Sequence, residues 1–242
     1  MKPLIAAAAA FILAVAAAIV FLLNRHTGPG PDAFTGAYPL VTAAPTGVPA
    51  LTWRPTGNPA GPLPVFPGTG SRVTGRITDR TIGVSYARFG PPWRQLTSGR
   101  SVDHSSGQEM DAKVKDYKHF WYAAVYAGPL DPKLDVAGPQ RLRAAAELTG
   151  QDFVKSLYSA DGSRKDLAGA PLSVDRHAGW ITAFRMTHTT ESDRLLKSQT
   201  EVVVALDTGR REPAIVEITI PGNQPQLLPD INQLVRSLHV VG

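Results

Sequence analysis

The chain contains no cysteine. This absence excludes disulfide bonds, thiolate metal sites, cysteine nucleophiles and a lipidated amino-terminal cysteine. It does not limit the fold, because a folded part of roughly 170 residues buries about 70% of its unfolded surface and needs no cross-link.

The sequence also lacks the short motifs that mark common catalytic sites. There is no Gly-x-Ser-x-Gly elbow, and no Ser-x-x-Lys or Ser-Asp-Asn context. The glycine-rich "GPGPDAFTG" does not follow a strand, and its prolines remove amides that could bind phosphate. We therefore expect no catalytic, cofactor-binding or metal-binding residues and classify the chain as a non-enzyme.

A concentrated charge of one sign is missing as well, although the net charge is +5. From Ser71 onward the chain has 22 basic residues (25 − 3) and 19 acidic residues (20 − 1), and the two signs are interspersed. Nucleic-acid binders concentrate basic residues on one face or in one run. We therefore expect no nucleic-acid partner.

The amino terminus carries an uncharged apolar run from Leu4 to Leu23. At 1.5 Å per residue, a helix of this length crosses a hydrocarbon core of about 30 Å. Residues 1–26 are predicted to be a transmembrane signal-anchor that leaves the rest of the chain outside the cytoplasm. The alternative is cleavage after a shorter apolar stretch, which would make the protein secreted.

Proline and glycine dominate the next segment, with 10 prolines and 8 glycines between Thr27 and Gly70. Such a composition cannot bury enough apolar surface to offset its ordering entropy, so residues 27–71 are predicted to be a disordered linker. Its seven threonines leave O-glycosylation and a plain spacer as alternatives. The apolar residues Trp53, Leu63, Val65 and Phe66 could dock onto the domain or a partner.

Residues 72–242 are predicted to form a domain outside the cytoplasm. Strands are expected in "RTIGVSYARF", "HFWYAAVYAGPL" and "GWITAFRMTH", and a hairpin in "EVVVALDTGRREPAIVEITI". The aromatic segment is apolar on both faces, which indicates a central strand. Helical spacing predicts helices over residues 139–159 and in "LLPDINQLVRSLHVV", whereas "SADGSRKDLAGAP" is expected to be a loop. The order of these elements predicts an α+β fold, an antiparallel sheet with two packed helices.

The domain resembles the PsbP-like fold of actinobacterial cell-envelope proteins and photosynthetic extrinsic subunits. The resemblance covers about residues 72–242. It rests on the opening "IGVSYARFGPPWRQ", the meander of "GWITAFRM", "EVVVAL" and "AIVEITI", and the closing "LPDINQLVRSLHV". It implies a PsbP-like sandwich that acts as a binding or scaffolding module, with no family-wide catalytic residues. Some relatives carry a lipoprotein cysteine, and the helix over residues 4–23 would replace it as the anchor.

Two polar clusters are candidate sites. Asp103, His104, Glu109 and Asp111 lie together in "SVDHSSGQEMD" and could bind a divalent cation, but a solvated loop is the preferred interpretation. The second cluster flanks the Trp180 strand, and a polar strand edge is the preferred interpretation there because the zinc-helix pattern lacks its second histidine. Its residues are His177, His188, Glu191 and Asp193.

Aromatic residues form a third candidate, a ligand cleft. At strand spacing we expect them to belong to the core instead. They are Trp93, Phe120, Trp121, Tyr122, Tyr126 and Trp180.

Two functions follow from the sequence. The preferred hypothesis is a membrane-tethered extracytoplasmic interaction or scaffolding module of the cell envelope, anchored through residues 4–23 and bound to an envelope protein. The alternative is a small-ligand-binding or hydrolytic envelope protein with a site near the aromatic face and His177/His188. Neither hypothesis requires a cofactor.

Overall fold

A computed structural model describes residues 60–96, 104–112, 121–134, 136–157, 162–187 and 197–242. All of them belong to one compact unit, residues 42–242. The expected membrane helix over residues 4–23 lies outside these ranges. Within them, no helix is both long enough and apolar enough to cross a bilayer.

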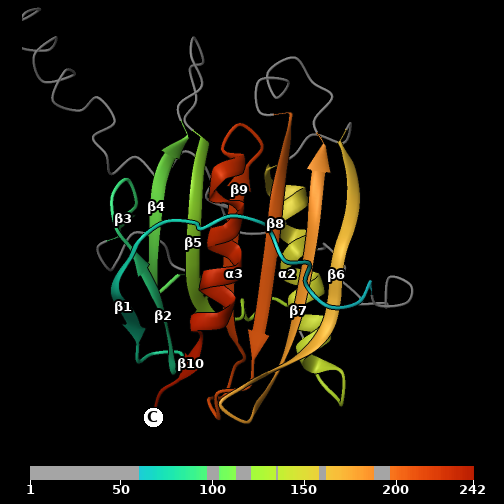
Figure 1. The fold of residues 1–242 in the computed structure, drawn as a ribbon. Helices are drawn as coiled ribbons and strands as arrows, with labels where there is room; N and C mark the ends of the chain where they lie inside the picture. Colours follow the sequence, from blue (N-terminus) through green and yellow to red (C-terminus); the bar gives the residue numbers. More distant parts are fainter. Residues whose placement is uncertain (1–59, 97–103, 113–120, 135, 158–161, 188–196) are drawn as a thin grey trace, which may run out of the picture. The chain divides into compact units, whose positions relative to one another are not determined.

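The described chain forms two antiparallel sheets and two α-helices (Figure 1). The large sheet contains, in spatial order, β3 (Arg94–Gln95), β4 (Ser106–Ala112), β5 (Trp121–Pro129), β9 (Ala214–Pro221), β8 (Ser198–Leu206), β7 (His177–Thr187) and β6 (Ser163–Val174). The small sheet contains β1 (Val73–Asp79), β2 (Val84–Phe89) and β10 (His239–Val240). The helices are α2 (Arg141–Leu157) and α3 (Leu228–Ser237), and a short 3-10 helix, η2 (Pro225–Leu227), precedes α3. The predicted α+β fold with antiparallel strands and two helices is confirmed, but the strands form two sheets instead of the single sheet expected.

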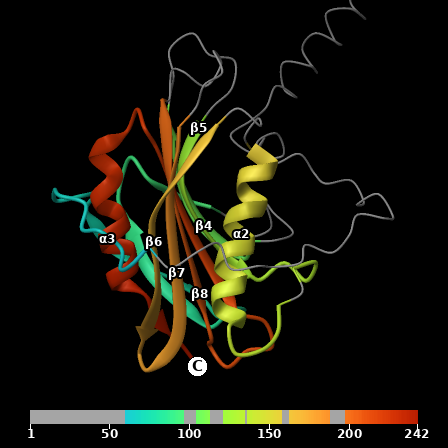
Figure 2. The ribbon, with the colours of Figure 1, turned by 90° about the vertical axis from the view of Figure 1, so that its right-hand side faces the viewer.

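The central strands carry apolar side chains on both faces, so both faces of the large sheet must be covered. Figure 2 shows α2 on one face and α3 on the other. On the α2 side, Leu148 lies in a buried cluster with Val203 and Ile215. On the α3 side, Ile231 and Leu234 lie in the larger core cluster, which the small sheet shares. Complete burial of a leucine or isoleucine side chain stabilises a fold by about 1.5–3 kcal/mol.

Strong periodicity predicted several elements correctly. The helix expected over 139–159 is α2, the closing helix is α3, and the aromatic segment is the interior strand β5. The predicted hairpin is formed by β8 and β9. The strand expected in "RTIGVSYARF" begins only at Val84, because the preceding residues turn the chain from β1 into β2.

Two segments expected to be loops are strands. "SADGSRKDLAGAP" contains the start of β6, an edge strand whose exposed polar residues hide the alternation of its pairing with β7. "SVDHSSGQEMD" contains most of β4, where Gln108 and Glu109 are fully buried. Gln108 fits there because it accepts from the Phe89 amide (2.9 Å) and donates to the Ala87 carbonyl (2.8 Å).

The expected domain boundary at residue 72 falls inside the folded unit. Residues 60–71, here called the strap, run across the α3 side of the large sheet from β6 towards β1 (Figure 1). Phe66 is buried in the main core and Leu63 packs against it, whereas Val65 is 71% exposed. Two of the four apolar residues singled out in the linker therefore dock onto the domain, and Trp53 lies outside the described residues.

Gly150 of α2 provides a test of the contact between this helix and the large sheet. A Cβ atom added there would lie 2.9 Å from Cε1 of the buried Phe184. Helix propensity alone would make Gly150→Ala stabilising by about 1 kcal/mol. We predict the opposite, a loss of about 1–3 kcal/mol in the free energy of unfolding, because the closely packed interface must shift.

Denaturant unfolding of the full chain measures this change, with Gln151→Ala on the same helix as the matched control. The control should change stability by no more than about 0.5 kcal/mol. A stabilised Gly150→Ala protein would show that α2 does not approach β7 as closely as described.

Candidate functional site

The face of the large sheet that α2 covers carries a row of polar side chains. Four residues are neighbours across successive strands, which places Glu109, Ala124, Thr219 and Glu201 in one row. Because partners in an antiparallel pair point to the same face, these side chains share the α2 side. Glu109 and Glu201 are at most 2% exposed. Buried carboxylates require hydrogen-bonded partners.

Each carboxylate of this row has such a partner. The Arg94 guanidinium binds Oε1 of Glu109, and its Nε atom lies 3.0 Å from that oxygen. The Thr219 hydroxyl donates to Oε1 of Glu201 (2.5 Å) and accepts from the Gln199 amide. The row therefore works as a structural network that keeps two buried charges satisfied within the sheet.

Of the four candidate metal ligands in "SVDHSSGQEMD", the structure describes the side chains of His104 and Glu109, and these two contact different partners. The Nε2 atom of His104 lies 3.9 Å from Oε2 of Glu217, and its ring contacts that of Tyr126 at 4.8 Å. Glu109 instead binds Arg94. Asp103 lies outside the described residues, and the side chain of Asp111 is not described. Among the described side chains, no group of three His, Asp or Glu residues could hold a metal ion.

Of the four residues in the second polar cluster, His177 is the one that the structure describes. Its Nδ1 atom lies 2.9 Å from the backbone carbonyl of Asp207, whose carboxylate pairs with Arg141 and accepts from the Gly209 amide. The Gly209 hydrogen bond, followed by the bond and charge of Arg141, lowers the pKa of Asp207 despite some desolvation. Its stabilising contribution is therefore present above the usual pKa of 3.8 and is lost as the pH falls through the lowered value. His188, Glu191 and Asp193 lie outside the described residues.

Three of the six aromatic side chains are described, and they lie on both faces of the large sheet. Trp93 lies in the core on the α3 side, 5.3 Å from the Phe89 ring. Tyr126 and Trp180 are on the α2 side, where the guanidinium of Arg143 lies 5.3 Å from the Trp180 ring. Phe120 lies outside the described residues, and the side chains of Trp121 and Tyr122 are not described. The described aromatic residues belong to two separate core regions, as expected for packing residues.

Helix α3 holds the strap through consecutive side chains at its start. Asn232 exchanges two hydrogen bonds with the backbone of Phe66, at 3.2 and 2.6 Å. Gln233 donates to the Thr69 carbonyl. Gly70 has a positive φ of 70°, and a Cβ there would lie 2.6 Å from Oδ1 of Asp230. The glycine therefore permits the close approach of the strap to the helix.

Asp230 is the centre of this attachment. It is completely buried, and its carboxylate accepts hydrogen bonds from the Ser71 amide, the Ser71 hydroxyl (2.7 Å) and the indole Nε1 of Trp93 (3.0 Å). Desolvation raises the pKa of Asp230, although the bonds from Ser71 and Trp93 act in the opposite direction. The contribution of this carboxyl to stability is therefore fully present below its usual pKa of 3.8 and is lost as the pH rises through the raised value.

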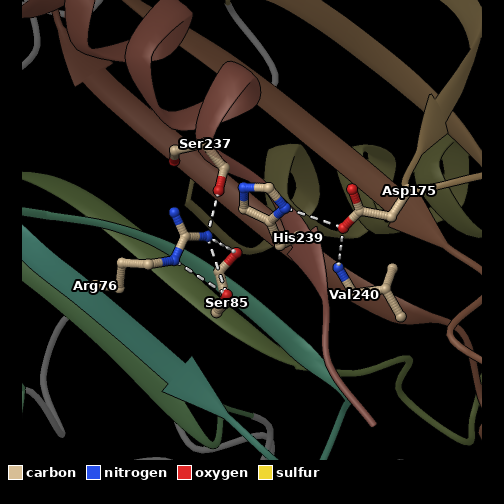
Figure 3. A network of polar contacts seen from close by, with 6 residues as sticks. All are labelled: Arg76, Ser85, Asp175, Ser237, His239 and Val240. Atoms are coloured by element: carbon tan, nitrogen blue, oxygen red, sulfur yellow. Dashed lines mark hydrogen bonds and ion pairs between the residues drawn. The ribbon is translucent and has the colours of Figure 1, made fainter.

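A second polar network closes the carboxyl-terminal end of the domain (Figure 3). Arg76 donates to the Ser237 carbonyl at the end of α3 and to the hydroxyl and carbonyl of Ser85, both at 3.0 Å. Asp175, in the turn between β6 and β7, accepts from the Val240 amide and lies 3.0 Å from Nδ1 of His239. Arg76 thus connects the small sheet to the end of α3, and Asp175 connects β10 to the turn between β6 and β7.

No short-range pattern in the sequence indicates the Asp230 site. Asp230 lies within the predicted closing helix, and Ser71 is the last residue of the expected linker. The helix prediction is correct, but the role of the carboxylate depends on Ser71 and Trp93, which are 159 and 137 positions away in sequence. Short-range spacing cannot reveal such a contact.

Comparison with known proteins finds only distant structural similarity. No protein-family model matches the chain, and no curated protein matches it. Among solved structures, similar proteins include cyanobacterial PsbP (CyanoP) from Synechocystis, with 13% identity, a TM-score of 0.43, and coverage of 74% of this chain and 99% of that one. A mutant of the protein Mog1 has 10% identity, a TM-score of 0.44, and coverage of 69% and 95%. The chain thus has a weak PsbP-like resemblance, as the sequence suggested.

Replacing Asp230 tests the attachment of the strap. Asp230→Ala leaves the Ser71 amide without its acceptor and removes one of the two acceptors of the Trp93 indole, which keeps only the Ser71 hydroxyl. We therefore predict a loss of about 2–4 kcal/mol in the free energy of unfolding. We also predict faster hydrogen exchange at the Ser71 and Phe66 amides. Hydrogen exchange followed by mass spectrometry of the full chain measures this local release.

Asp175→Ala is the matched control, since it also removes a carboxylate with two partners, but one that is exposed. It should leave exchange in residues 60–71 unchanged. Equal protection of the strap in the Asp230→Ala and wild-type proteins would contradict the described role of Asp230.

Proposed function

We propose that the chain is a membrane-tethered extracytoplasmic interaction module of the cell envelope. Residues 4–23 form a single-pass anchor, residues 27–59 form the linker, and the α+β domain meets an envelope protein outside the membrane. This proposal shortens the expected linker, because the strap belongs to the domain.

The attachment of the strap is the observation that carries the proposal. Side chains of α3 hold residues 66–71, and the backbone of Gly169 in β6 donates to Gly61 (2.9 Å). A linker that simply ended in a domain would need no such attachment. Because the strap is fixed along its length, the linker leaves the domain at a defined place beside β6. A coil of residues 27–59 spans about 30 Å, which would keep the domain close to the membrane surface.

The use of the buried polar groups also supports an interaction module. Glu109 binds Arg94, Glu147 binds Arg143 within α2, and Asp230 binds the strap. Each of these carboxyl groups has a hydrogen-bond partner within the fold. In the described residues, His177 is likewise bound to a backbone carbonyl and lends no support to the hydrolytic alternative.

Truncation separates the anchor from the domain. We predict that the protein without residues 1–26 is soluble and monomeric, because the apolar run is removed and the strap is kept. Membrane fractionation and size-exclusion chromatography with light scattering measure both properties. A truncated protein that stays with membranes or aggregates would contradict the tethered-domain arrangement.

A second truncation is the control for the domain boundary. A protein that lacks residues 1–71 also loses Phe66 and both Ser71 donors to Asp230, so it should unfold at a lower denaturant concentration than the first truncated protein. Equal stability of the two proteins would show that the strap is not part of the domain.

The proposed function itself is tested by cross-linking the full chain in cells and identifying the products by mass spectrometry. Capture of one specific envelope protein, together with an intact amino-terminal peptide, is the expected result. Loss of that peptide with no captured protein would overturn the proposal and favour a secreted ligand-binding protein.

The histidines distinguish this proposal from an enzyme. We predict that His177→Ala and His188→Ala leave the captured partner unchanged. His177→Ala should reduce stability by only about 0.5–1.5 kcal/mol, because one hydrogen bond to a carbonyl is lost. Capture is measured with the cross-linking assay, and folding with circular dichroism. A cellular defect in either variant while the fold is intact would contradict the non-enzyme assignment.

A further inference from the structure

Exposed arginines are concentrated on the small sheet. Between residues 71 and 89 the only charged side chains are four arginines and Asp79. The aspartate is 5% exposed and accepts from the Thr81 amide and the Ser105 hydroxyl, whereas every arginine is exposed. The arginines are Arg72, Arg76, Arg80 and Arg88. This surface, here called the arginine edge, therefore carries an uncompensated positive charge.

None of these four arginines forms an ion pair within the described part of the chain. Arg76 binds the neutral oxygens of Ser85 and Ser237, and Arg88 donates to the carbonyl of Thr74. Other arginines of the domain do pair with a carboxylate, among them Arg94, Arg141, Arg143 and Arg164. Arg76 and Arg88 are thus held in place by neutral groups while their charge stays available to an anion.

Strand β1, which contains Arg76 and is flanked by Arg72 and Arg80, lies at the edge of its sheet, and Arg88 is on the neighbouring strand β2. The strand order β1–β2–β10 gives β1 one neighbour, and its other side bonds to no described strand. An edge strand presents a row of backbone donors and acceptors to which a further strand can pair. The arginine edge therefore combines backbone pairing groups with a positive charge.

We propose that the arginine edge binds an extended acidic segment of the partner protein, which adds to the small sheet as a strand beside β1. The proposal rests on the proposed function and names the chemistry of the partner. Side chains at every second residue of a strand point to the same face and lie about 6.6–6.8 Å apart. A segment with glutamate or aspartate at alternate positions would therefore present a line of carboxylates to the guanidinium groups.

The same charges argue against a second copy of this chain as the occupant. Two arginine edges placed side by side would repel each other, and charged residues on edge strands prevent self-pairing for this reason. The edge at β6 is a weaker candidate. It carries charges of both signs, in Arg164, Lys165 and Asp166, and Gly169 already pairs with Gly61 of the strap.

Binding of a defined peptide to the purified full chain in detergent tests this proposal. The probe is a fluorescein-labelled nine-residue peptide of alternating glutamate and valine, and a lysine–valine peptide of equal length is the control probe. Fluorescence anisotropy at two salt concentrations measures the affinity. We expect binding of the acidic peptide only, and weaker binding at the higher salt concentration.

Charge reversal locates the binding surface. Arg72→Glu combined with Arg80→Glu should weaken binding at least tenfold, and neither side chain makes an ion pair in the described fold whose loss would unfold the protein. Arg211→Glu is the matched control, because Arg211 is an exposed arginine in the connection between β8 and β9. That variant should bind within about twofold of the wild type.

Backbone pairing is tested with the same acidic peptide methylated at alternate amides. We expect at least a tenfold loss of affinity, because the methyl groups remove the donors of one peptide edge. Equal affinity of the methylated peptide, equal binding of the lysine peptide, or no binding of the acidic peptide would each overturn the proposal. Binding to phosphatidylglycerol vesicles that the Arg72/Arg80 variant loses, without peptide binding, would overturn it in favour of a lipid surface.

Failure of this inference can be told apart from failure of the proposed function. If cross-linking in cells still captures an envelope protein while the peptide does not bind, the interaction module stands and the arginine edge is not its contact surface. If cross-linking captures nothing, the proposed function fails whatever the peptide does.

Discussion

The apolar character of both faces of the central strands is the constraint on which the rest of the structure depends. On β5, Val125 faces the main core and Tyr126 faces the α2 side, and both are buried. The two sides of β8 and β9 are covered in the same way. Because water must be excluded from both faces, one helix is needed on each side. The small sheet and the strap complete the cover on the α3 side.

Covering a sheet on both sides places polar residues in the interior, and the fold provides a partner for each of the main ones. Gln108 forms two hydrogen bonds with the backbone of β2, and Arg94 forms an ion pair with Glu109. Asp230 accepts three hydrogen bonds from Ser71 and Trp93. Satisfied networks of this kind stabilise one arrangement of elements, because any slip leaves a charge or amide buried alone. The Asp230 network has the widest reach, since it joins the strap, the segment after β2 and the start of α3.

The sequence predicted those elements whose stability comes from regular burial. Residues 139–159 and the closing "LLPDINQLVRSLHVV" have helical apolar spacing. The hairpin of β8 and β9 consists of two largely apolar strands on either side of a short turn segment. The errors fall where burial is irregular or polar. β6 is polar because it lies at an edge, and the strap is rich in proline and glycine yet is bound through Asp230, Asn232 and Gln233.

The candidate sites were harder to predict than the fold, because each polar residue finds its partner on a distant strand. His104 and Glu109 are close in sequence and suggested a shared cation, but they lie beside Glu217 and Arg94 respectively. Proximity in sequence was therefore a poor guide to which groups act together. The sequence does not indicate the arginine edge for a related reason: the overall charge balance is nearly even, and only the fold brings Arg76 of β1 beside Arg88 of β2.

The strap runs between two opposite edges of the domain. It begins beside β6, at Gly61, and ends beside Asp230 and Trp93, just before β1. In Figure 1 it crosses the α3 side between these two edges. The arginine edge therefore lies beyond the end of the strap that is opposite to Gly61. A strand added beside β1 would not displace the contact between Gly61 and Gly169, so the proposed partner segment and the start of the strap occupy different edges of the domain.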